Sequence, residues 1–177
     1  MADDPSSRIR DAVALMTIAP DARVLEVGCG HGVATTLVCE QLGEGGSMVA
    51  IDRSTSMVAD TGARNAEHVL DGRLVVRGAR IARASLEPAS FDVIFAINVR
   101  DVWGDPATSA TLRDALATGG SLWAFMQLPP GRDPSGADTS IAKRLAAAGF
   151  EIVQTGTTDA PQVPSGWVQC SVVRDQD

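Results

Sequence analysis

The stretch that most constrains this chain is VLEVGCGHG, residues 24–32, where an apolar, strand-forming run breaks into three alternating glycines. Gly28, Gly30 and Gly32 are followed by VATTLV, a pattern typical of the start of a helix. Glycine is needed where something approaches the backbone too closely for a side chain. A turn between a strand and a helix also presents backbone N–H groups and the positive end of the helix to a ligand. We therefore expect a ligand site at this turn.

The spacing of the glycines separates two classes of ligand. Dinucleotide sites use G-x-G-x-x-G, but here the third glycine comes one residue early and Val33 stands in the expected place. Glu26, two residues before the first glycine, would repel a pyrophosphate and would attract a ligand that carries an ammonium group. The local chemistry favours a cofactor with an amino-acid group, and a nicotinamide-dependent oxidoreductase is the disfavoured alternative.

Short apolar strands alternate with helical segments along the chain, which predicts an α/β fold with a parallel sheet. No repeat or linker divides it, so we expect one domain, residues 1–177, with an N-terminal helix in 1–20 and a cofactor-binding core in 21–177. The last two strands lie too close together for a helical crossover and should form an antiparallel pair at one sheet edge. The expected strands are 22–27, 47–52, 73–78, 91–98, 121–127, 151–155 and 166–173, and the later expected helices are 32–42, 54–70, 107–117 and 139–148.

Composition excludes several function classes. The net charge is −7 and no basic run occurs, which argues against nucleic acid as a partner. The start of the chain is polar and acidic and no apolar run has membrane-spanning length, so we expect a cytoplasmic protein without a membrane partner. Three cysteines at unrelated spacings and two histidines predict neither a disulfide framework nor a metal site.

The stretch LEVGCGHG resembles motif I of the class I S-adenosylmethionine-dependent methyltransferases, acid-x-Gly-x-Gly-x-Gly. The resemblance runs from about Arg23 to Val173, through VAIDRSTSM, FDVIFAINVRDVWGDP and LRDALATGGSLWAF. It implies a Rossmann-like three-layer sandwich whose seven-stranded, mostly parallel sheet has the order 3-2-1-4-5-7-6, with strand 7 antiparallel. It also implies S-adenosylmethionine as cofactor, S-adenosylhomocysteine as product, and methyl transfer to an O-, N- or C-nucleophile of a small molecule.

The resemblance assigns cofactor contacts residue by residue. Asp52, at the end of the second strand, would bind the ribose hydroxyls, and Met57 would form the adenine wall. Asn98 would contact the methionine end through its backbone, and Cys29 would offer only its backbone N–H. The whole expected cofactor set is Glu26, Gly28, Cys29, Gly30, Asp52, Arg53, Met57, Gly78, Ala79, Arg80 and Asn98.

One departure from the family concerns the adenine end. After the third strand many members carry Gly-Asp-Ala, whose acid binds the adenine amino group, whereas here Ala79 and Arg80 follow Gly78. The loss of one hydrogen bond costs about 1 kcal/mol, so cofactor binding should be weaker but not abolished.

A second departure concerns the acceptor side. NVRDVWGDP resembles N-V-L-H-H-W-x-D-P, but Arg100, Asp101 and Val102 stand where Leu-His-His often stands. Without the histidine base, Asp101 is the best candidate for the catalytic acid or base. Arg100 could hold an anionic substrate, and Trp103 could line an apolar or cationic pocket. The alternative is that Arg100 and Asp101 form a solvated pair on a loop.

Three loops should shape the acceptor pocket at the carboxyl ends of the strands: 99–105, 128–138 and 156–166. A second copy of the chain could close that pocket in a homodimer. The alternative to small-molecule methyl transfer is a methyltransferase-like fold that binds S-adenosylmethionine, or another ligand, for a non-methylating or regulatory role.

Overall fold

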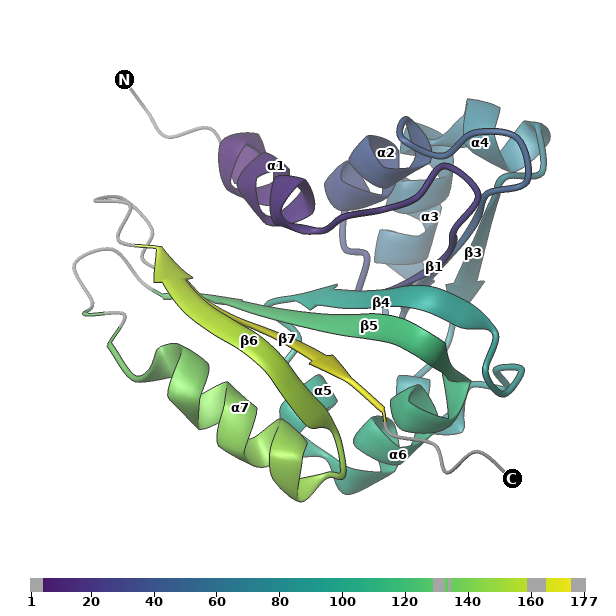
Figure 1. Cartoon of the computed structure of the whole chain (residues 1–177). Coiled ribbons are helices and arrows are strands. Elements are labelled where there is room, and N and C mark those ends of the chain that lie inside the picture. The colour runs from purple at the N-terminus through teal and green to yellow at the C-terminus, as the bar shows by residue number, and fades with distance from the viewer. Residues whose placement is uncertain (1–4, 129–132, 134, 159–164, 173–177) are drawn as a thin grey trace.

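The chain forms a three-layer sandwich around one mixed sheet (Figure 1). The computed structural model describes residues 5–128, 133, 135–158 and 165–172. The strands are β1 (Arg23–Val27), β2 (Ser47–Asp52), β3 (Leu74–Gly78), β4 (Phe91–Ile97), β5 (Leu116–Gln127), β6 (Glu151–Thr158) and β7 (Ser165–Ser171). Their order is β3-β2-β1-β4-β5-β7-β6, and β7 is antiparallel to both β5 and β6, so the predicted sheet is confirmed.

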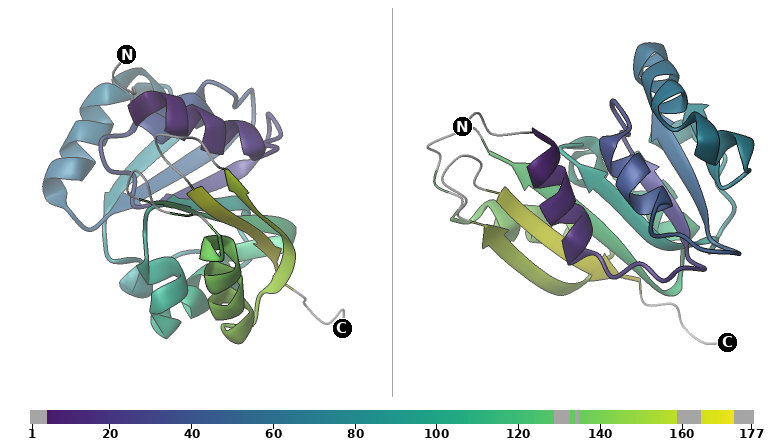
Figure 2. Two further views of the ribbon diagram at one scale, coloured as in Figure 1. Left: turned by 90° about the vertical axis from the view of Figure 1, so that its left-hand side faces the viewer. Right: turned by 90° about the horizontal axis from the view of Figure 1, so that it is seen from above.

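Helices cover both faces of the sheet. On one face lie α1 (Pro5–Leu15), α2 (Val33–Cys39), α3 (Thr55–Arg64) and α4 (Ala66–Leu70), and on the other lie α5 (Asp101–Gly104), α6 (Pro106–Ala115) and α7 (Ala137–Ala147) (Figures 1 and 2). A short 3₁₀ helix, η1 (Ile81–Arg83), packs against α6. None of the described helices is long and apolar enough to cross a bilayer.

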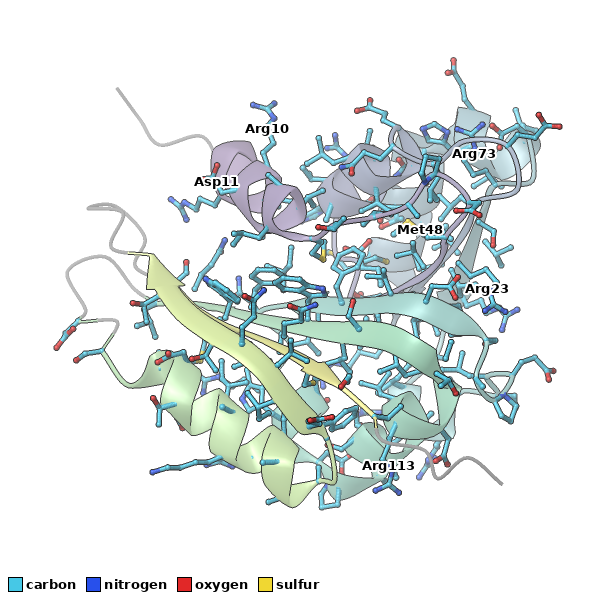
Figure 3. The ribbon with its side chains drawn as sticks, viewed as in Figure 1. Arg10, Asp11, Arg23, Met48, Arg73 and Arg113 are labelled. Atoms are coloured by element: carbon cyan, nitrogen blue, oxygen red, sulfur yellow. The ribbon has the colours of Figure 1, made fainter. Side chains whose placement is uncertain are left out.

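The alternation of side chains along each strand divides the core in two. In β1, Val24 belongs to the core under α1 and α2, and the next residue, Leu25, belongs to the core over α6 and α7. Both are fully buried. Met48 of β2, labelled in Figure 3, lies in the first of these cores. Because β1 is paired on both edges and covered on both faces, its buried residues are apolar except for Glu26.

The helix expected over 54–70 is two helices, and the break lies at Asn65. Gly62, a residue with low helix propensity, is inside α3 and does not end it. The side chain of Asn65 donates to the carbonyls of Thr61 and Gly32 and accepts a hydrogen bond from Thr36 Oγ1. These bonds fix Asn65 outside the helical region and tie α3 to the start of α2.

Two other boundaries differ from expectation. β5 begins at Leu116, so Gly119 and Gly120 lie inside the strand, where its register against β4 shifts. An added Cβ at Gly120 would lie 2.9 Å from the carbonyl oxygen of Asp92, which explains the need for glycine there. The segment expected as a loop after β4 contains the four-residue helix α5. The expected loops 128–138 and 156–166 lie partly outside the described residues.

Candidate cofactor and acceptor site

The three glycines of the turn between β1 and α2 all have positive φ, but they serve different purposes. A Cβ on Gly28 would collide with the side chain of Val99, and one on Gly32 would lie 2.8 Å from Asn65 Nδ2. A Cβ on Gly30 would have no neighbour within 4 Å. Gly28 and Gly32 are therefore required by the packing of the chain itself, whereas Gly30 faces open space.

Asp52 joins the end of β2 to this turn. Its Oδ2 accepts a hydrogen bond from the N–H of Gly30 at 3.0 Å, and its Oδ1 accepts one from the N–H of Ser54 at 2.9 Å. A carboxylate has about four acceptor sites, so both oxygens can still accept from a ligand hydroxyl. The half-buried carboxylate holds the glycine turn in shape and faces the same edge of the sheet.

Glu26 is buried beneath the turn, with 3% of its surface exposed. Thr35 Oγ1 in α2 donates to Glu26 Oε2 at 2.5 Å, and no described residue is hydrogen-bonded to Oε1. Desolvation raises the pKa of Glu26 to about 8; the Thr35 hydrogen bond opposes that shift, and the charge of Asp52 adds to it. A buried acid with one unpaired oxygen is well suited to a partner that brings positive charge.

A cavity of about 580 Å³ opens at the carboxyl ends of β1, β2 and β4. This size is typical of sites for cofactors and small ligands. Its lining includes eight of the expected site residues: Gly28, Asp52, Arg53, Ala79, Arg80, Asn98, Arg100 and Asp101. The remaining lining residues are Val27, Ile51, Ile81, Ala82, Ile97, Val99, Asp105 and Thr108.

Two of the carboxylates that line this cavity have side-chain partners within the protein. Asp101 Oδ2 lies 3.8 Å from Arg53 Nη1, and both side chains are more than half exposed. Asp105 caps α6 and accepts hydrogen bonds from the N–H and the hydroxyl of Thr108, which lower the pKa of Asp105. The ion-pair partner of Asp101 is thus Arg53, which follows β2, and not the neighbouring Arg100.

Asn98 braces the ends of β4 and β5 against each other. It has φ +63°, and its Nδ2 donates to Gln127 Oε1 while its Oδ1 accepts from the N–H of Gln127. Its own N–H donates to the carbonyl of Phe125. These three bonds hold a left-handed asparagine at the cavity wall and fix where the chain turns into Val99 and Arg100.

Six expected site residues lie outside the cavity lining: Glu26, Cys29, Gly30, Met57, Gly78 and Trp103. The N–H of Cys29 donates to the carbonyl of Ile51, so this donor has a partner within the chain, and the expected contact of Cys29 with the cofactor stays a prediction. Burial raises the pKa of the Cys29 thiol to about 11. Trp103 is 9% exposed and packs in the core with Val102, away from the acceptor space it was expected to line.

Some site residues were not anticipated from the sequence. Thr35, the partner of Glu26, and Val99, which fills the space at Gly28, are examples. The paired threonines at 35 and 36 on a helix that follows a buried acid are a signal that could have been noticed. No group of three metal-ligating side chains is present among the residues the structure describes.

Residues 24–120, more than half of the chain, match the family described as methyltransferase domain. The chain belongs to the methyltransferase domain family. It is 34% identical over 112 residues to nocamycin O-methyltransferase of Saccharothrix syringae, a match that covers 63% of this chain and 40% of that protein. The chain therefore spans less than half of the length of this relative.

Solved structures share the fold over nearly the whole chain. An S-adenosylmethionine-dependent methyltransferase from Aquifex aeolicus has a TM-score of 0.80 at 18% identity, and the match covers 97% of this chain and 95% of that one. The cyclase SpnF has a TM-score of 0.77 at 15% identity, with coverage of 94% and 81%. Geranyl diphosphate C-methyltransferase from Streptomyces coelicolor has a TM-score of 0.70 at 10% identity, with coverage of 95% and 78%. At such identities these likenesses establish the fold.

Proposed function

We propose that this protein transfers the methyl group of S-adenosylmethionine to an O-, N- or C-nucleophile of a small molecule and releases S-adenosylhomocysteine. The observation that carries the proposal is the glycine turn: Gly30 faces open space and is hydrogen-bonded to Asp52 beside a cavity at the sheet's carboxyl edge. Ligands of parallel sheets bind at that edge, where neighbouring strands diverge. The relative named as an O-methyltransferase supports the reaction class and favours an oxygen nucleophile.

The residues present fit such a cofactor. The turn at Gly28–Gly30 would hold the amino-acid end, with the unpaired oxygen of buried Glu26 as counter-charge. Asp52 would accept from the ribose hydroxyls, and Ala79 at the cavity wall would border the adenine. When bound, the cofactor supplies a methyl group on a positively charged sulfur.

The chain's own residues have two tasks in such a reaction. They must align the nucleophile and exclude water, and they must accept a proton if the nucleophile arrives protonated. Asp101, exposed at the cavity wall after β4, is the proposed proton acceptor. Arg53 Nη1, 3.8 Å from Asp101 Oδ2, would hold this carboxylate in place at the cavity.

We also propose the cytoplasm as the location and no nucleic-acid partner, in keeping with three free cysteines and a net charge of −7. A homodimer whose second copy closes the acceptor side is part of the same proposal, and light scattering would measure it.

Calorimetry tests the cofactor assignment. We expect S-adenosylhomocysteine to bind and NAD not to bind. Asp52→Ala should weaken that binding by about 1.5–3 kcal/mol through the loss of charged hydrogen bonds. Asp71→Ala is a matched control, because Asp71 also accepts from the N–H two residues later, at Arg73, but lies away from the cavity. Equal affinities in wild type and Asp52→Ala would contradict the cofactor site.

Product analysis tests the reaction. A methyltransferase forms S-adenosylhomocysteine in step with methylated acceptor. The alternative, a non-methylating role, is favoured by the missing acid at Ala79 and the missing histidines at Asp101 and Val102, and SpnF, a cyclase by name, shares this fold. Binding of S-adenosylmethionine without any formation of S-adenosylhomocysteine across acceptors of all three nucleophile types would support that alternative.

A further inference from the structure

Some of the charged side chains that line the cavity have partners within the protein, and others have none among the described residues. Three carboxylates line it, and each has a partner within the protein: Asp52 accepts from backbone N–H groups, Asp105 caps α6, and Asp101 lies beside Arg53. Each carboxylate is thus satisfied by groups close to it in the structure. None of these contacts involves Arg80 or Arg100, the other two arginines of the lining.

Two arginines of the lining remain uncompensated. Arg80 and Arg100 are exposed at the cavity, and among the described residues neither guanidinium has an ion pair or a hydrogen bond. Other arginines of the chain are engaged, such as Arg23 with Asp92 and Arg73 with the carbonyls of Cys39 and Leu42. In a chain of net charge −7, two free guanidinium groups at one cavity are notable.

The two arginines come from different parts of the sequence, and both line the cavity. Arg100 directly precedes α5. Arg80 directly precedes Ile81, which packs in one core cluster with Val102 of α5 and Leu112 of α6. The segment after β3 therefore crosses to the α5 and α6 side of the cavity and takes Arg80 with it.

The walls near these arginines are apolar. Ile81 follows Arg80 in the sequence and Val99 precedes Arg100, and both line the cavity together with Ile97. A ligand that satisfies this arrangement has an apolar body and an anionic group, and planar guanidinium groups are well suited to bind a carboxylate or a phosphate in bidentate fashion.

We propose that the acceptor carries an anionic group, a carboxylate or a phosphate, which Arg80 and Arg100 bind. This inference rests on the proposed methyl transfer, since it names the substrate class of the same site, and it assigns Arg80 to the acceptor in place of the cofactor contact that the resemblance implies. The anion would anchor the acceptor at the α5 and α6 side and leave its nucleophile free to face the glycine turn.

Ligand-observed NMR titrations test the proposal on the whole protein, with and without saturating S-adenosylhomocysteine. The probes are benzoate and phenyl phosphate as anions and methyl benzoate as the neutral counterpart. We expect at least one anion to bind tenfold or more tightly than methyl benzoate, and its binding to weaken as salt is added. Comparison of benzoate with phenyl phosphate shows which anion the site prefers.

Variants assign the preference to the two arginines. The double variant Arg80→Ala with Arg100→Ala should lose the anion preference, and the corresponding double lysine variant should keep part of it. Arg83→Ala is the matched control: Arg83 is exposed in the same segment but is not part of the lining, so the preference should be unchanged.

Three results would overturn the inference. Methyl benzoate could bind as tightly as the anions, the double alanine variant could retain the preference, or saturating S-adenosylhomocysteine could abolish it. In the last case the arginines hold the cofactor's carboxylate and not the acceptor. Failure of S-adenosylhomocysteine to bind while the anions still bind would instead count against the proposed function and leave an anion site in place.

Discussion

Glu26→Gln distinguishes an acid that serves a ligand from one that only anchors a helix. Glu26 is 3% exposed and accepts one hydrogen bond, from Thr35. The amide oxygen of glutamine can accept the same bond, so α2 should stay anchored. Burial raises the pKa of Glu26 to about 8, and the free protein therefore holds this side chain mainly protonated at neutral pH.

The raised pKa fixes the sign of a pH effect on stability. The folded chain keeps a proton that the unfolded chain loses above its ordinary pKa of 4.5, so this contribution to stability is fully present below pH 4.5. It is lost as the pH rises towards the folded-state pKa of about 8. At about 1.4 kcal/mol per unit of pKa difference, the full loss is on the order of 5 kcal/mol. The free energy of unfolding of Glu26→Gln should not decrease in this way as the pH rises.

Urea unfolding at pH 5 and pH 9 measures the effect. We expect the free energies of unfolding of wild type and Glu26→Gln to agree within about 1 kcal/mol at pH 5, because both side chains are then neutral in the folded protein and the pH is close to the pKa of 4.5 in the unfolded chain. At pH 9 the variant should be more stable by several kcal/mol. Parallel pH dependences in the two proteins would refute an acid whose ionisation is opposed by burial.

Ligand binding should favour the ionised form of Glu26, which burial disfavours in the free protein. An ammonium group near Glu26 favours the ionised carboxylate, so binding of S-adenosylhomocysteine at pH 7 should release close to one proton from wild type and none from Glu26→Gln. Calorimetry in two buffers of different ionisation enthalpy counts these protons. The variant should also bind at least tenfold more weakly. Equal proton release and equal affinity would leave Glu26 as an anchor for Thr35 alone.

Three further substitutions test other parts of the site. Gly30→Ala should cost about 1–2 kcal/mol of stability from its positive φ and lower cofactor affinity more than tenfold, whereas Gly72→Ala, equally strained and unobstructed, should leave affinity unchanged in calorimetry. Asn98→Ala and Asn98→Gly both lose the brace to Gln127 and should slow turnover, but only the alanine variant is strained, so it should unfold more easily by about 1 kcal/mol. Asp101→Asn should lower turnover by roughly 10²–10⁴ with unchanged affinity for S-adenosylhomocysteine; a loss of that affinity would place Asp101 on the cofactor side instead.

The strands and the antiparallel edge could be predicted because both depend on short-range features, whereas the order of the strands was implied by the resemblance to the methyltransferase family. Apolar runs mark the strands, and the few residues between the last two allow no helical crossover. The break at Asn65 could not be predicted, because the side chain of Asn65 makes its decisive bonds to Gly32 and Thr36, about thirty residues away. Gly62 was the stronger local signal and proved irrelevant to the end of α3.

At the candidate site, the positions of the glycines and of the acidic residues could be predicted from the sequence, but the residues that contact them could not. Gly30 and Asp52 follow buried strands at one sheet edge, and the structure joins them by a hydrogen bond. Nothing in the local sequence showed that Val99 would fill the space at Gly28 or that Ile51 would take the N–H of Cys29. Those contacts depend on how β4 and β2 lie beside β1, which is a property of the sheet.

This difference between local features and long-range contacts also applies to the two ends of the cavity. One end could be predicted from the sequence more completely than the other. The turn at Gly28–Gly30 is formed mainly by backbone conformation, and glycines restrict that conformation wherever they occur. The proposed acceptor end is formed by side chains from separate segments, such as Arg53 beside Asp101, and Arg80, which directly precedes η1. A change of one such side chain alters the charge presented to an acceptor without altering the turn. Substrate choice can therefore diverge within this fold while the cofactor turn is preserved.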